Sequence, residues 1–227
     1  MKGNVVLRSG TPNDSNRTYL PEEIKGSDMV VNENGNNSQP YPDGLIESHG
    51  VLADGLSDTW YEYVPKSYDP GRKTPLVIGV HGGLMTGWGH AIYTSWTMVA
   101  DRDGFICVFP DAHALRMWMV EGVFDNFDPA AAPDLPIRPA PKDYRENHDL
   151  NFFLALIEAM KAKYNIDEER IFMQGMSMGN LMTGQFARYY GNLLAGAAGS
   201  GGPAPLKMVF DPEGKIINRA GPVPVWQ

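Results

Sequence analysis

Gly175-Met176-Ser177-Met178-Gly179 is the stretch that decides the fold. Residues 170–174 before it, with the apolar run Ile171-Phe172-Met173, predict a buried strand, and residues 180–190 after it predict a helix. A serine with a glycine two positions away on each side, between a strand and a helix, is the pattern of a nucleophile elbow. The glycines lack the Cβ atoms that would collide where strand and helix converge. Ser177 is therefore expected at the tip, with its hydroxyl exposed at a helix N-terminus; the alternative is a glycine-rich loop that merely carries a serine.

The length, composition and net charge of the chain exclude several classes of protein. A length of 227 residues, of which 43% are hydrophobic, fits one substantial globular domain or two small ones. The net charge of −8 argues against nucleic acid or an anionic membrane as a partner. No apolar run reaches the roughly 20 residues that cross a bilayer, and no signal peptide is visible at the start. The compartment stays open between the cytoplasm and export with the signal removed.

The residue composition divides the chain into a leader and a domain. Residues 1–45 are rich in Asn, Ser, Gly and Pro and predict a poorly structured leader with one short strand near Val5, whereas 46–227 form the domain. Strands are predicted at 59–65, 75–80, 105–109, 170–174, 193–198 and 223–226, helices at 93–103, 149–164 and 180–190, and a hairpin at 206–218. Because strands alternate with helices, we expect a mostly parallel sheet with helices on both faces.

A second glycine-rich turn, His81-Gly82-Gly83, follows the predicted strand at 75–80. Acyl transfer needs two donors aimed at the carbonyl oxygen as it becomes an oxyanion, and glycines let the backbone approach closely. We assign one donor to the Gly83 amide, with Gly82 as a near alternative, and the other to the Met178 amide. His81 is interpreted as a structural residue beneath the loop. The competing interpretation is a plain strand-to-helix turn.

Five segments carry a resemblance to a known family. Residues 76–83, 100–105, 108–111, 149–153 and 164–179 resemble, in the same order, the polyhydroxybutyrate depolymerase and feruloyl esterase branch of the α/β-hydrolases. The resemblance runs from about residue 59 to the end and leaves the leader uncovered. It implies an α/β-hydrolase fold and a serine esterase that cleaves polyester, feruloyl, acetyl or similar esters through an acyl-enzyme, without a cofactor. The family often has a cysteine where this chain has Gly83, a residue that acts through its main chain.

The partners of a catalytic serine are missing from the expected positions. In this fold the order is serine, then acid, then histidine. All five histidines precede Ser177, and the acidic residues after it are Asp211 and Glu213, both in the predicted hairpin turn. The sequence therefore predicts the N-terminal portion of a hydrolase, a fold incomplete at its C-terminus, with acid and base beyond Gln227 or on a companion polypeptide. The alternatives are a site rewired to an upstream histidine, His90 or His113, and an inactive relative.

Aromatic residues suggest where a substrate would lie. Trp88, Trp118 and His90 are predicted to line the substrate pocket, since loops at that rim form the pocket in this fold. Trp96 and Tyr93 are interpreted as helix-core residues. The stretch 120–142 is rich in Pro and Ala, lacks periodicity, and is interpreted as a long surface excursion, a candidate lid.

No metal site is predicted. His148 stands beside Asp149 at an expected helix start, where Asn147 or Asp149 would cap the helix. No pair of histidines or carboxylates shows the spacing typical of metal ligands, and no C-x-x-C pair is present.

The leading hypothesis is a serine carboxylic ester hydrolase acting on a small-molecule or oligomeric ester. A prolyl-oligopeptidase-like serine peptidase shares the elbow but normally has a large N-terminal domain, which the leader is too short to form. A catalytically incomplete fragment or binding module is the third hypothesis.

Overall fold

The computed structural model describes residues 43–113, 116–128, 130–131, 138–201, 213, 215 and 223–226. Residues 1–42 of the predicted leader, with its strand near Val5, lie outside the described residues, whereas Leu45 at its end already belongs to strand β1 (Leu45–Gly50). Apart from residues 213 and 215, the predicted hairpin at 206–218 also lies outside the described residues. Among the described helices, none has both the length and the apolar composition needed to cross a membrane.

The described strands form one seven-stranded sheet of order β1-β2-β4-β3-β5-β6-β7. Strand β2 runs antiparallel to both β1 and β4, and every other neighbouring pair is parallel. The mostly parallel sheet predicted from the alternation of elements is confirmed. The strands are β1 (Leu45–Gly50), β2 (Asp58–Tyr63), β3 (Thr74–Val80), β4 (Ile106–Pro110), β5 (Ile166–Met176), β6 (Gly196–Ser200) and β7 (Val225–Trp226).

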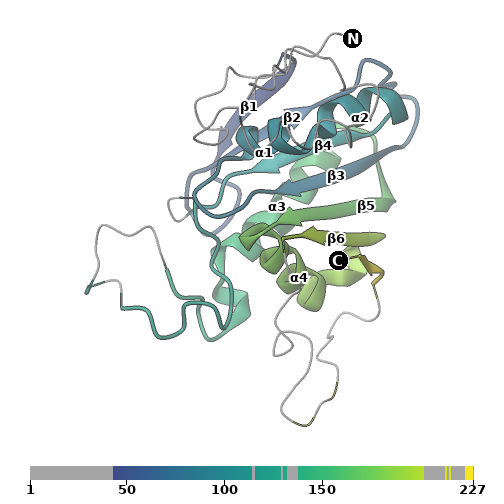
Figure 1. Ribbon diagram of the computed structural model, residues 1–227. Coiled ribbons are helices and arrows are strands. Elements are labelled where there is room, and N and C mark those ends of the chain that lie inside the picture. The colour runs from purple at the N-terminus through teal and green to yellow at the C-terminus, as the bar shows by residue number, and fades with distance from the viewer. Residues whose placement is uncertain are drawn as a thin grey trace, which may run out of the picture.

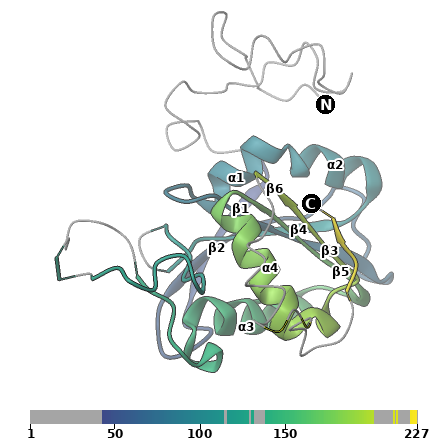
Figure 2. The same cartoon turned by 60° about the horizontal axis from the view of Figure 1, so that its bottom comes forward.

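Helices cover both faces of the sheet, as Figures 1 and 2 show. Helices α1 (Gly87–Thr94) and α2 (Trp96–Asp103) lie on one face, and α3 (His148–Lys163) and α4 (Met178–Tyr190) lie on the other. Two short 3-10 helices, η3 (Tyr144–Glu146) and η4 (Gly191–Leu193), precede α3 and follow α4.

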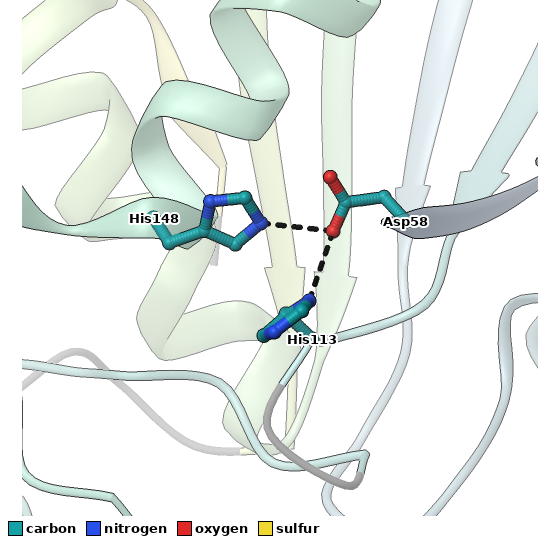
Figure 3. A group of neighbouring side chains, drawn as sticks. All are labelled: Asp58, His113 and His148. Atoms are coloured by element: carbon teal, nitrogen blue, oxygen red, sulfur yellow. Dashed lines mark hydrogen bonds and ion pairs between the residues drawn. The ribbon is translucent and has the colours of Figure 1, made fainter. Parts of the chain in front are cut away.

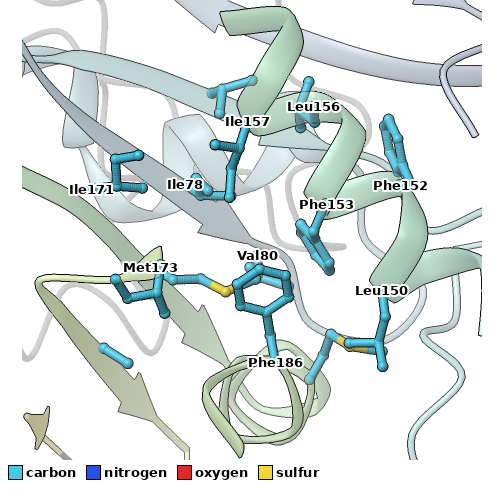
Figure 4. Close-up of a cluster of buried hydrophobic side chains, with 14 of the residues drawn as sticks. Ile78, Val80, Leu150, Phe152, Phe153, Leu156, Ile157, Ile171, Met173 and Phe186 are labelled. Carbon is cyan, nitrogen blue, oxygen red and sulfur yellow. The ribbon is translucent and has the colours of Figure 1, made fainter. Parts of the chain in front are cut away.

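The larger hydrophobic core lies between the sheet and the α3–α4 layer (Figure 4). Helix α3 contributes fully buried side chains at helical spacing, among them Leu150, Phe153 and Leu156, and strand β3 contributes Ile78 and Val80. Burying each such side chain is worth about 1.5–3 kcal/mol, so this layer anchors the strands that carry the candidate site. A smaller core lies under α1 and α2 and includes Phe109 and the buried Cys107.

Four features of the local structure differ from the sequence-based predictions. The helix expected at 93–103 is two helices, because Ser95 has φ 56° and breaks the helical path between α1 and α2. Tyr93 is exposed and is not a core residue. Strand β1 was missed because it is an edge strand whose residues are mostly exposed, and β6 starts only at Gly196 because 191–193 form a 3-10 turn.

Candidate active site

Ser177 lies on the tight bend between β5 and α4. Its backbone has φ 53° and ψ −117°, a conformation that residues with a side chain rarely adopt. The residue is exposed, and its hydroxyl makes no capping hydrogen bond to the helix that it precedes. An exposed serine held in a strained conformation at a helix N-terminus is the geometry that the sequence predicts for this position.

Hydrogen bonds on both sides hold the bend in this conformation. The Ser177 amide donates to the carbonyl oxygen of Ser200 at the end of β6, at 2.8 Å. The Ser177 carbonyl oxygen accepts the amides of Asn180 and Leu181, at 3.0 and 3.3 Å. The strained residue is therefore fixed by β6 and by the first turn of α4.

The two glycines of the motif are required by close packing of backbone atoms. A Cβ atom on Gly175 would collide with the carbonyl group of Gly179. A Cβ atom on Gly179 would collide in turn with the carbonyl oxygen of Val80, the last residue of β3. Strand β5, helix α4 and the end of β3 thus meet at a point where only glycine fits.

The predicted donor loop, Gly82 and Gly83, lies beside the elbow. A Cβ built on Gly82 would be 3.5 Å from the carbonyl oxygen of Met176, and one built on Gly83 would be 3.7 Å from Sδ of Met178. The structure therefore brings together the two segments that the sequence assigned to one site. That the amides of Gly83 and Met178 point at one oxygen stays a prediction.

His81 supports this loop from below. Its ring is fully buried, and Nε2 accepts the amide hydrogen of Ala112 at 3.0 Å. The ring proton is therefore on Nδ1, which donates to the Gly82 carbonyl oxygen at 2.6 Å. Burial lowers the pKa of His81 to about 3, so the ring is neutral at pH 7. Both nitrogens are engaged with the backbone, which fits the predicted structural role.

Trp118 and His90 do not lie where the sequence placed them. Trp118 is fully buried, its indole N–H donates to the His81 carbonyl oxygen at 2.8 Å, and its ring stacks on Phe153. His90 is also fully buried, Nε2 donates to Oε1 of Gln174, and burial lowers its pKa to about 4. Neither side chain has surface with which to contact a substrate, so both predictions are corrected.

Trp88, the third predicted pocket residue, is half-buried at the start of α1 and packs against the smaller core. Its role in binding stays a prediction.

The excursion that begins at Val120 is anchored to α4, since Glu121 accepts the Tyr189 hydroxyl at 2.6 Å and pairs with Arg188 at 3.1 Å. Residue 129 and residues 132–137 of the candidate lid lie outside the described part of the chain.

All five histidines lie in the described part of the chain, and no hydrogen bond joins any of them to Ser177. His49 lies on β1 with Glu47, and His113 and His148 both contact Asp58. His90 and His113, the upstream residues considered as alternative bases, therefore have other partners.

Comparison with known proteins agrees with this architecture. No family model matches the chain. It is 30% identical over 145 residues to feruloyl esterase B of Neurospora crassa, covering 62% of this chain and 43% of the relative. It is 26% identical to poly(3-hydroxyalkanoate) depolymerase C of Paucimonas lemoignei, covering 63% and 31%. A solved thermostable esterase matches with a TM-score of 0.58 at 22% identity, over 81% of this chain and 46% of that structure.

The fold is therefore that of the α/β-hydrolases, as the resemblance implied. The sequence similarities are to a feruloyl esterase and to a poly(3-hydroxyalkanoate) depolymerase. The chain spans less than half the length of these relatives.

Proposed function

We propose that this chain carries the nucleophile of a serine carboxylic ester hydrolase that works through an acyl-enzyme. The observation that supports the proposal best is Ser177 itself, an exposed residue with φ 53° at the junction of β5 and α4, beside the Gly82–Gly83 loop. A structural serine has no need of a strained backbone, whereas a nucleophile gains access to substrate from it.

In the proposed reaction, Oγ of Ser177 forms a bond to the ester carbonyl carbon as a general base removes the hydroxyl proton. The amides of Gly83 and Met178 stabilise the oxyanion, a contribution of about 2.7–4 kcal/mol for one such donor. The C–O bond then breaks, and the alcohol leaves with the proton returned by the base. Water, deprotonated by the same base, attacks the acyl-serine and releases the carboxylic acid.

The proposal places the acid and the base outside the described residues, beyond Gln227 or on a companion polypeptide. The positions of the histidines support this, because each of the five has ring contacts elsewhere. The names of the relatives support an ester of feruloyl or polyhydroxyalkanoate type as the substrate class. The bend at Ser177 and the Gly82–Gly83 loop would then bind the acyl carbonyl.

Covalent labelling tests this proposal directly. The chain is treated with a fluorophosphonate probe and with p-nitrophenyl acetate, and Ser177→Ala is compared with Ser67→Ala, an exposed serine before β3 at the opposite end of the sheet. Because the proposal places the base outside the described residues, we expect this chain alone to be labelled slowly at Ser177 and to show no turnover, with the labelling lost in Ser177→Ala and kept in Ser67→Ala. Equal labelling of both variants contradicts the proposal. Labelling without turnover identifies the chain as a catalytically incomplete part of the enzyme.

A further inference from the structure

A cluster of metal-ligating side chains forms away from Ser177, from three segments distant in sequence. Asp58 is the first residue of β2, His113 lies in the loop after β4, and His148 is the first residue of α3. Oδ1 of Asp58 lies 2.8 Å from Nε2 of His148 and 3.2 Å from Nδ1 of His113. Figure 3 shows both imidazole rings directed at the one carboxylate.

The Asp58 carboxylate is incompletely satisfied by the protein. Its side chain is fully buried, yet its second oxygen, Oδ2, has no hydrogen-bond partner among the described residues. A buried carboxylate normally has hydrogen bonds, an ion pair or a metal ion on its oxygens, because desolvation without a partner costs several kcal/mol. A cation at this carboxylate removes that cost.

His148 is held between two carboxylates, one at each ring nitrogen. Nδ1 lies 3.0 Å from Oδ2 of Asp54, and Asn151 also donates to this carboxylate. A neutral imidazole carries one proton, so when Nδ1–H donates to Asp54, Nε2 presents a lone pair toward Asp58 and His113. A carboxylate that accepts the distant N–H of a histidine is the usual outer partner of a metal-bound imidazole.

We propose that Asp58, His113 and His148 bind a Zn²⁺ ion, with Asp54 orienting His148. Ligands about 2.1 Å from a tetrahedral ion lie about 3.4 Å apart, and the three ligand atoms here lie within 4.8 Å of one another. Two imidazoles and one carboxylate suit Zn²⁺ better than the oxygen-seeking Ca²⁺ or Mg²⁺. The His113 side chain is 33% exposed, so the ion can enter from solvent, and water completes its coordination.

The ion would join the start of β2, the loop after β4 and the start of α3. That loop continues to the candidate active site, because Ala112, the neighbour of His113, donates its amide to His81, which supports Gly82. The proposed ion therefore has a structural role: it would hold together the segments that support the Gly82–Gly83 loop. The inference does not rest on the proposed esterase activity, and its test does not use that activity.

Zinc titration of the purified chain tests the site. The chain is stripped with a chelator and dialysed, and Zn²⁺ is added in a calorimeter while thermal unfolding is followed in parallel. We expect one Zn²⁺ per chain and a higher midpoint of unfolding with the metal. Asp58→Asn and His113→Asn should each lower the zinc affinity at least about tenfold. Because Asp54 orients the ligand His148, Asp54→Asn should lower the zinc affinity about 10–100-fold.

The control is His49→Asn, since His49 also pairs with a carboxylate, Glu47, but lies on β1 outside the cluster. It should bind zinc like the original chain. His113→Asn guards against misfolding, because its side chain is partly exposed whereas Asp58 is buried. Absence of saturable 1:1 binding, or affinity that is unchanged in all three cluster variants, overturns the proposal and leaves a hydrogen-bonded ion pair with a protonated His148.

Discussion

Gly201 and Ser177 are in contact across the end of β6. A Cβ atom on Gly201 would lie 3.0 Å from the Ser177 amide nitrogen and 3.2 Å from its Cα. The backbone at Gly201 has φ 89°, a conformation that favours glycine. Because the preceding carbonyl, that of Ser200, accepts the Ser177 amide, this glycine and the elbow form one packed unit.

Gly201→Ala is expected to displace the elbow. The new methyl group would press on the Ser177 backbone, and the positive φ adds strain of about 1 kcal/mol. We expect a large fall in the rate of fluorophosphonate labelling of Ser177, together with a lower midpoint of unfolding. Gly55→Ala is the control, because Gly55 has φ 70° but no atom within 4 Å of its Cβ position. Equal effects of the two substitutions on the labelling rate would show that the contact with Ser177 is unimportant.

Gly175→Ala tests the packing between β5 and α4. Its Cβ would overlap the Gly179 carbonyl and lie 2.5 Å from Oγ1 of Thr183, so α4 must move away from the sheet. Overpacking of this kind typically costs about 1–3 kcal/mol, and backbone atoms can yield little. Urea unfolding should show a loss at the upper end of that range. Gly196→Ala, whose Cβ would only touch the Phe172 ring at 3.5 Å, should lose much less, and a similar loss would contradict the steric argument.

The sequence predicted the sheet and the elbow because their signals are local. The apolar runs of β3, β4 and β5 have strand length, and the spacing of two glycines around Ser177 specifies a bend that bulkier residues cannot form. The secondary structure around the elbow is confirmed. The predicted roles of Gly83 and Met178 as oxyanion donors stay predictions, since proximity of the segments is what the structure adds.

Long-range contacts explain what the sequence could not provide. Trp118 is separated from His81 by 37 positions, and nothing local indicates that its indole N–H satisfies a backbone carbonyl in the core. The proposed zinc site was missed for the same reason. Asp58 and His148 are 90 positions apart, and the antiparallel placement of β2 beside β4 brings Asp58 next to the loop that carries His113. Residue spacing detects metal sites within one segment, not sites assembled by sheet topology.

His81 predicts how stability depends on pH. Its pKa is about 3 in the folded protein, because burial disfavours the charged ring, against 6.5 for an exposed histidine. Between these values the unfolded chain binds the extra proton, so the contribution is fully present above pH 6.5 and is lost as the pH falls toward 3. One histidine with this shift lowers the free energy of unfolding by about 1.4 kcal/mol per pH unit in this window.

His81→Asn removes the titrating ring while keeping a side-chain N–H that can reach the Gly82 carbonyl oxygen. Urea unfolding at pH 7 and pH 5 should show that the variant is less stable than the original chain at pH 7 but loses about 2 kcal/mol less on acidification. Ser67→Ala, at an exposed position that carries no titrating group, should retain the original pH dependence. If His81→Asn lost as much stability on acidification as the original chain, His81 would have to be protonated in the folded state. Its Nε2 could then no longer accept the Ala112 amide hydrogen, and the hydrogen-bonded link from the β4 loop to Gly82 would be wrong.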